Sequence, residues 1–296
     1  MKRLLTLGLL VGLGLLPTAA VAQSFGNSSP TLNADQASEI RSNSDIRVDV
    51  NADQVRTPEA IIHEYAFIGN TAEIIVIYLD WPRGQPTLHL YDQTGALVES
   101  RLPYPDRTVM TEWRGSHRAF RLPNTGEYRL VLSHNGWGTA AQGGFDFHLQ
   151  VRAASEYEQL SIQFAQLSDE QRYEDILPVL ADMMALAPEQ PRPYLWRVWT
   201  YAQLAISDLD ADHPVFQPRD AAQLLAAFHD IFQAQSADIQ TLVLADLHQA
   251  SQNYFALADD ETVKLGQFQP ELLVLLADLL ETGEASPHLV DILQNW

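Results

Sequence analysis

The spacing of apolar residues changes at Arg152, and this change constrains the fold more than any other feature. Just before it, Phe145, Phe147, Leu149 and Val151 alternate with polar residues, which is typical of a strand with one apolar face. After it, apolar residues recur every three or four positions, as in amphipathic helices. The sequence therefore predicts a multidomain β + α protein, an antiparallel β-sandwich followed by an all-α region.

Five segments with strand character follow one another closely in residues 60–152: 63–69, 73–80, 86–100, 117–133 and 143–151. Turn residues separate them, and Gly95 and Gly126 lie where a turn needs backbone freedom. Short strands at this spacing predict a jelly-roll-like sandwich. We interpret the last two strand patterns, joined by a glycine-rich loop, as a strand pair.

The first 22 residues are typical of a cleaved secretory signal. Lys2 and Arg3 precede an apolar run, and a small-residue cleavage motif ends at Ala22. A retained anchor is the alternative, but the run is shorter than the roughly 20 residues that a membrane span needs. We therefore expect a periplasmic or secreted protein without a stable membrane span after cleavage.

Residues 23–59 are rich in Ser, Asn, Asp and Gln, and they predict a flexible leader. Within it, Ile46, Val48 and Val50 alternate as in one strand, which could add to an edge of the following sheet. The chain contains no cysteine, which excludes disulfides, thiolate chemistry and a cysteine-linked lipid anchor.

Residues 153–296 predict an acidic all-α domain, a helical-hairpin bundle or short solenoid. Ser168 and Gln171 have the spacing of a capping box and predict a helix start, and Pro178 predicts a kink or break. Residues 173–204 resemble a tetratricopeptide-type helical hairpin. Apolar residues share further helix faces, such as Leu224, Phe228, Ile231 and Phe232 on one, and Ile239, Val243 and Leu247 on another.

Acidic residues dominate the charge of the chain. Without the first 22 residues, 16 basic residues face 38 acidic ones, and residues 153–296 hold 5 basic and 23 acidic residues. Such a charge disfavours nucleic acid and anionic lipid surfaces as partners. Solvation of an exported surface is the simpler explanation of this charge.

A turn motif inside the sandwich carries a family resemblance. Residues 122–128 read Leu-Pro-Asn-Thr-Gly-Glu-Tyr, after one strand and before another. With the strand order around it, this motif resembles the bacterial pre-peptidase C-terminal domain family over about residues 60–152. The resemblance implies a small extracellular β-sandwich, and some relatives bind calcium or matrix polymers. On that basis alone, Asp80, Asp92 and Asp106 at strand ends are candidate calcium ligands.

Motifs for catalysis are missing from the sequence. There is no Gly-x-Ser-x-Gly elbow, no HExxH pair and no phosphate-binding loop after the signal segment. We therefore expect a protein that is not an enzyme and needs no cofactor, with calcium as the possible exception. An uncharacterised hydrolase, with a histidine and a carboxylate in one pocket, is the least favoured alternative.

Tryptophans are the remaining candidates for binding. Trp81, Trp113 and Trp137 fall in or beside loops of the sandwich, where they could stack on sugars or instead seal the sandwich ends. Trp196 and Trp199 share one helix and belong to the helical core or its groove. The sequence favours an exported binding protein, with the sandwich on an envelope or matrix polymer and the helices on a protein segment. The alternative is a carbohydrate-binding module that uses the loop tryptophans.

Overall fold

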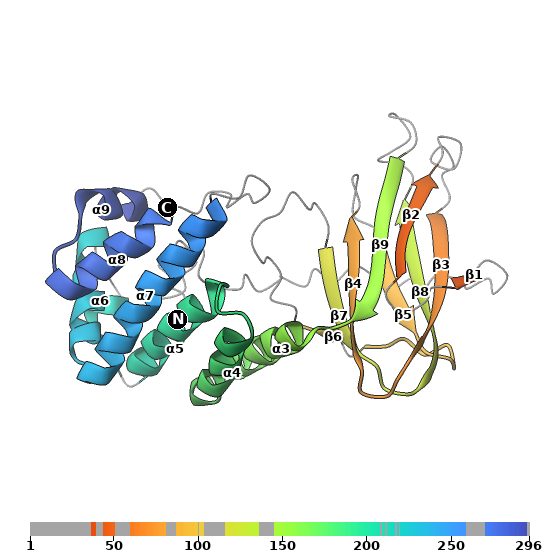
Figure 1. Cartoon of the computed structure of the whole chain (residues 1–296), viewed down its shortest axis with the longest axis horizontal. Helices are drawn as coiled ribbons and strands as arrows, with labels where there is room; N and C mark the ends of the chain where they lie inside the picture. The colour runs from red at the N-terminus through yellow and green to blue at the C-terminus, as the bar shows by residue number, and fades with distance from the viewer. Residues whose placement is uncertain are drawn as a thin grey trace. The chain divides into compact units, whose positions relative to one another are not determined.

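The structure is a computed structural model of the whole chain (Figure 1). It describes residues 37–39, 44–50, 60–80, 87–99, 101–103, 116–135, 145–207, 209–210, 212–216, 218, 220–258 and 270–294. These residues form two compact units, a β unit up to Ile162 and a helical unit from Gln163. The predicted order of a β-sandwich and then an all-α region is confirmed. The predicted signal segment, residues 1–22, lies outside the described residues.

Two sheets make up the β unit. The four-stranded sheet has the order β1-β3-β8-β5 and the five-stranded sheet the order β2-β9-β4-β7-β6. Each neighbouring pair is antiparallel except β1 and β3. The strands are β1 (Ala37–Glu39), β2 (Ser44–Val50), β3 (Ala60–Gly69), β4 (Ile74–Asp80), β5 (Thr87–Tyr91), β6 (Arg101–Leu102), β7 (Ser116–Arg121), β8 (Gly126–Asn135) and β9 (Phe145–Ala153).

Two predictions about individual strands have different outcomes. The edge strand expected around Ile46 is present as β2, which pairs with β9. The strand pair expected from the two patterns near Arg152 is wrong, because β8 pairs with β3 and β5, whereas β9 pairs with β2 and β4. Alternation along a strand determines which face is buried, but it does not determine the partner strand.

The core of the sandwich lies between the sheets. Every second residue of the facing strands points inward, as expected for a period of two. The members of this core include Tyr65, Phe67, Ile75, Ile77, Leu79, Leu88, Leu90, Phe120, Leu122, Tyr128, Leu130, Leu132, Leu149 and Val151. Because Val76 and Tyr78 on the opposite face of β4 are buried too, β4 is the fully covered central strand that its apolar run predicts.

The Leu-Pro-Asn-Thr-Gly-Glu-Tyr motif forms the corner between β7 and β8. The hydroxyl of Tyr128 donates to the carbonyl oxygen of Asn124 at 2.5 Å and accepts from its backbone N–H at 3.1 Å. The Tyr128 ring stacks on Phe67, with 5.6 Å between ring centroids. One side chain therefore fixes the corner and fills the core.

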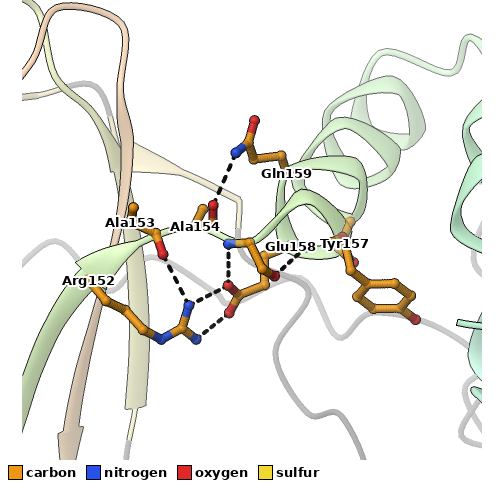
Figure 2. A network of polar contacts seen from close by, with 8 residues as sticks. Arg152, Ala153, Ala154, Tyr157, Glu158 and Gln159 are labelled. Carbon is orange, nitrogen blue, oxygen red and sulfur yellow. Dashed lines mark hydrogen bonds and ion pairs between the residues drawn. The ribbon is translucent and has the colours of Figure 1, made fainter. Parts of the chain in front are cut away.

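The junction between β9 and helix α3 (Glu156–Asp169) is held by a polar network (Figure 2). Glu158 accepts from both terminal nitrogens of Arg152 and from the backbone N–H of Ser155. The hydroxyl of Ser155 accepts in turn from the backbone N–H of Glu158 at 3.2 Å. Ser155 and Glu158 therefore form a capping box that begins α3. Ile162 of α3 packs with Val76 and Ala119 of the five-stranded sheet.

The capping box expected at Ser168 and Gln171 is wrong. Helix α3 runs through Ser168, and Gln171 adopts a positive φ of 61° in the turn that follows. The break expected at Pro178 is also wrong, because α4 is continuous through it. Pro178 is the sixth residue of α4, so the helix continues through it at the cost of one backbone hydrogen bond, the one to the carbonyl oxygen of Glu174.

The other described helices are α4 (Tyr173–Leu186), α5 (Arg192–Ser207), the short 3-10 helix η3 (Pro214–Phe216), α6 (Ala221–Gln233), α7 (Ala237–Ala258), α8 (Glu271–Thr282) and α9 (Pro287–Gln294). Helix α4 packs on α5, α5 on α7, and α7 on α8, while α6 contacts α5, α8 and α9 (Figure 1). The resemblance of residues 173–204 to a tetratricopeptide hairpin stays a prediction. Within the described ranges, no helix combines the length and hydropathy that crossing a bilayer requires.

We predict that Tyr128→Phe destabilises the β unit by about 1 kcal/mol, the usual net contribution of such hydrogen bonds. The ring and its contact with Phe67 remain, so the loss measures the corner hydrogen bonds. Urea unfolding followed by a probe of the β unit measures the change. Tyr91→Phe is the matched control, because the Tyr91 hydroxyl makes no hydrogen bond within the described part of the chain. Equal stability of Tyr128→Phe and wild type would contradict this role of the corner.

Candidate functional site: an apolar pocket in the helical unit

A pocket of about 30 Å³ lies between α5, α6, α7 and α8. Most of its lining is apolar, and the polar members are Tyr201 and Gln235. The lining residues are Val198, Tyr201, Ala202, Ala205, Phe228, Ile231, Phe232, Gln235, Ile239, Val243 and Leu280.

Helical spacing brings the lining residues together. On α5, Val198, Ala202 and Ala205 lie four and three positions apart and share one face. Ala202 and Ala205 have the smallest side chains of the set, and the space above them is left unfilled. Phe228 and Phe232 of α6 supply the largest apolar surfaces opposite, and both are buried.

The rim of the pocket is held by hydrogen bonds around the turn between α6 and α7. Gln233 donates from its side-chain amide to the carbonyl oxygen of Leu280 at 3.0 Å, which ties α6 to α8. Gln240 donates to the carbonyl oxygens of Gln233 and Gln235, and Gln235 donates to that of Ile231. These bonds satisfy backbone oxygens that a helix end leaves without partners, so they fix the shape of the rim.

The chemistry of the lining is that of binding an apolar group. None of the residues that line the pocket is a carboxylate, an imidazole or an amine. The half-buried residues at its opening are Tyr201, Ala205, Gln235 and Ile239, whereas Val198 and Phe228 below them are buried. A small apolar group that enters here exchanges water for carbon contacts, at about 25 cal/mol per Å² of surface buried.

Acidic residues surround the pocket. Helices α6 to α9 contain no lysine or arginine. Asp230, Asp238 and Glu281 are each exposed and each adjoin a lining residue in sequence. The surface beside the pocket is therefore negative, which favours basic groups on a partner.

A buried ion pair joins α5 to α7 close to the pocket. Arg197 donates two hydrogen bonds to the carboxylate of Asp246, at 2.7 and 2.6 Å. The Asp246 side chain is 3% exposed and that of Arg197 22%. Burial raises the pKa of Asp246, and the hydrogen bonds from Arg197 oppose that rise. The hydrogen bonds to Asp246 raise the pKa of Arg197.

The structure places Trp196 and Trp199 in the helical core. They are 5% and 4% exposed. The Trp196 ring stacks on Phe164 with 4.2 Å between centroids, and Trp199 meets Phe164 and Tyr173 edge to face. Neither tryptophan lines the pocket, so the groove on α5 is formed by other residues of the same helix.

The other predicted site residues lie mostly outside the described ranges. This applies to Trp81, Trp113, Trp137 and Asp106, and to the side chain of Asp80, which ends β4. Their roles stay predictions.

Asp92 is the candidate calcium ligand whose side chain is described. Its Oδ1 accepts from the hydroxyl and N–H of Thr94 and from the N–H of Ala96, at 2.6 to 3.0 Å. The hydrogen bond from the Thr94 hydroxyl is the main reason that the pKa of Asp92 is lowered. Among the described residues, no group of three or more His, Cys, Asp or Glu could hold a metal ion. The calcium prediction needs Asp80 and Asp106 as well, so it stays a prediction.

The apolar faces of α6 and α7 are apparent in the sequence, but the pocket between them is not. A stripe such as Phe228, Ile231 and Phe232 predicts burial, and these residues are buried. The sequence feature that could have indicated the pocket is the pair of small residues Ala202 and Ala205, which lie opposite larger residues of α6. Recognising it requires knowing that α5 faces α6, which the sequence pattern does not contain.

Comparisons with known proteins gave distant structural matches. No family model matches the chain, and no curated protein matches it. The pre-peptidase C-terminal domain of collagenase from Bacillus anthracis is 15% identical, covers 41% of this chain and 100% of its own, with a TM-score of 0.28. The periplasmic g-type lysozyme inhibitor PliG from Salmonella Typhimurium is 8% identical, covers 40% of this chain and 98% of its own, with a TM-score of 0.24. Part of the chain is thus similar in structure to both proteins.

We predict that Asp246→Asn destabilises the helical unit by about 3 kcal/mol, because removing one partner leaves the other buried charge uncompensated. Urea unfolding followed by tryptophan fluorescence measures the change, since Trp196 and Trp199 lie on the same helix as Arg197.

The control is the double variant Arg197→Met, Asp246→Leu. It removes both charges and replaces them with apolar groups of similar size, so it should recover most of the lost stability. A double variant as unstable as Asp246→Asn would show that the pair contributes by more than charge compensation.

Proposed function

We propose that this protein is a non-catalytic binding protein of the cell exterior or periplasm, and that its helical unit binds a protein segment. In this proposal, the pocket between α5, α6, α7 and α8 receives a small apolar side chain of that segment. The observation that carries it is the lining of the pocket, which is apolar and borders exposed carboxylates.

The size of the pocket restricts the ligand. A volume of about 30 Å³ accommodates a methyl group or the tip of a valine, but not an aromatic ring. Only one small side chain of a partner enters, so the remaining contacts must come from the surface around the opening. A polypeptide supplies such contacts along its length, as when an apolar anchor enters a groove between helices.

Charge defines the rest of the partner. The surface next to the pocket carries Asp230, Asp238 and Glu281, and helices α6 to α9 contain no lysine or arginine to neutralise them. The basic groups beside them are histidines: His229 lies 3.7 Å from Asp230, and His248 lies 3.6 Å from Glu281. A segment with lysine or arginine on either side of the apolar anchor is complementary. Such a pairing increases the association rate, and its affinity falls as salt screens the charges.

We predict that a random peptide library displayed against the full chain yields sequences with a small aliphatic residue flanked by lysine or arginine. Fluorescence anisotropy of a selected peptide should show an affinity that weakens as the salt concentration rises. Selected peptides without basic residues, or with affinities independent of salt, would contradict the charge argument.

We predict that Ala205→Leu reduces the affinity for the selected peptide by at least about tenfold, because the larger side chain fills the opening of the pocket. Ala226→Leu is the matched control: Ala226 is exposed on α6 and does not line the pocket. Thermal unfolding of both variants reports whether each is folded.

The alternative is that the pocket is only a packing defect. In that case Ala205→Leu raises the melting temperature by filling the defect and leaves peptide binding unchanged. This pair of results would overturn the proposal.

A further inference from the structure

A second candidate site lies in the β unit, on the outer face of the sheet β1-β3-β8-β5. The register places Glu64 of β3 opposite Val131 of β8, and Val131 opposite His89 of β5. Because the inward residues of these strands are Tyr65, Leu130 and Leu90, the row formed by Glu64, Val131 and His89 points away from the sandwich core. Glu64 and His89 therefore flank one valine on the same face.

Two polar atoms in this row lack a hydrogen-bond partner. Glu64 is 4% exposed, and its Oε2 has no donor; the Nδ1 of His89 is likewise buried without a partner. Glu64 makes no ion pair with any described residue, including Arg129, which lies one row away on the same face. Buried polar atoms are almost always paired in folded proteins, so two unpaired atoms in one row need an explanation.

The protonation of His89 favours an acceptor at this position. Burial lowers its pKa, and the charge of Arg118 lowers it further. The ring is therefore neutral near pH 7, and in the tautomer that carries its proton on Nε2 the Nδ1 atom is an acceptor. In that tautomer the row presents two acceptors, one of them on a carboxylate.

The face opens at one end of the row. Ile68, four residues along β3 from Glu64, is 65% exposed, and Ala66 between them is half-buried. Exposure along this face of β3 therefore falls from Ile68 to Glu64, so a ligand would have to reach Glu64 from the Ile68 end with a long, thin group.

We propose that the Glu64, Val131, His89 row binds the guanidinium or ammonium group of an arginine or lysine side chain on a partner polypeptide. A buried carboxylate is stabilised by an opposite charge that also donates hydrogen bonds. The long methylene stems of arginine and lysine pack on apolar surface, which Ala66 and Ile68 offer on this face, while the charged group is held beyond them.

Other ligand classes fit the row less well. A metal ion would need more ligands than the described residues provide here. A neutral sugar would leave the carboxylate without a countercharge, and Tyr91, the aromatic side chain in the next row, is only 7% exposed and offers no open ring for stacking.

The test uses the full chain with N-acetyl-arginine amide and N-acetyl-lysine amide as probes. N-acetyl-glutamine amide and a methyl glucoside are the neutral controls. Binding is followed by NMR through the side-chain carboxyl carbon of Glu64 and the ring nitrogens of His89. The expected result is a shift of both signals with at least one cationic probe and with neither neutral compound, and a loss of at least tenfold in affinity in Glu64→Gln.

Two further variants test the acceptor and the fold. His89→Asn keeps an acceptor near the position of Nδ1 and should retain more binding than His89→Leu. Without any probe, Glu64→Gln should raise the melting temperature of the β unit, because it removes an uncompensated buried charge. The Ala205→Leu variant of the helical pocket should bind the cationic probes as wild type does, so failure of one site is distinguishable from failure of the other.

Three outcomes would overturn the proposal. One is equal binding of a cationic probe by wild type and Glu64→Gln. Another is a Glu64-dependent response to the methyl glucoside, which would identify a sugar site instead. The third is the absence of any response to the cationic probes together with a lower melting temperature of Glu64→Gln, which would assign Glu64 a structural role.

Discussion

Burial of apolar side chains is the constraint on which both units depend, because the chain has no cysteine and therefore no disulfide to limit its unfolded state. The β unit meets this requirement between two sheets, where Leu90, Leu130 and Leu149 are fully buried. The helical unit meets it by packing aromatic rings, with Phe164 stacked on Trp196 and edge to face with Trp199. Charged groups are buried most economically as pairs, and Arg197 with Asp246 is the clearest case. Trp199, His89 and Glu64 each keep a buried polar atom without a partner, and Glu64 suggests a function because its atom belongs to a carboxyl group.

Much of the fold follows from local sequence, and the errors share one cause. The alternation around Leu149 and Val151 identifies a half-buried strand, and the change of period after Arg152 locates the transition to helices. Strand partners are different, because β8 and β9 are neighbours in sequence but belong to different sheets. The capping boxes show the same limit: Ser168 with Gln171 has the right spacing, but Ser155 with Glu158 forms the cap, supported by Arg152 from the preceding strand. When two short motifs have the spacing of a capping box, the sequence alone does not tell which of them begins a helix. The answer depends on contacts with other parts of the chain, such as those of Arg152.

The candidate sites were harder to predict than the fold for a related reason. Tryptophans stand out in a sequence, but Trp196 and Trp199 pack inside the helical core. The pocket depends on Ala202 and Ala205, which are inconspicuous until α6 is known to face them. Likewise, Glu64 and His89 are 25 positions apart and become neighbours of Val131 only through the register of three strands. Both sites are products of packing between distant segments, and single-sequence patterns report mainly on local geometry.

Both proposed sites would bind a basic polypeptide, but they recognise it through different interactions. The helical unit offers a negative surface around a small apolar pocket, so it attracts basic segments broadly and discriminates by the side chain that enters. The row formed by Glu64, Val131 and His89 offers one buried carboxylate, and a bound cation would compensate the unpaired charge of that carboxylate. This site therefore selects for a positive charge at the end of a long side chain. Because both sites are on one chain, a basic polypeptide that engages one is held at high effective concentration near the other, provided its length can span the two. Two weak contacts of this kind can together produce tight binding, although neither needs a large interface.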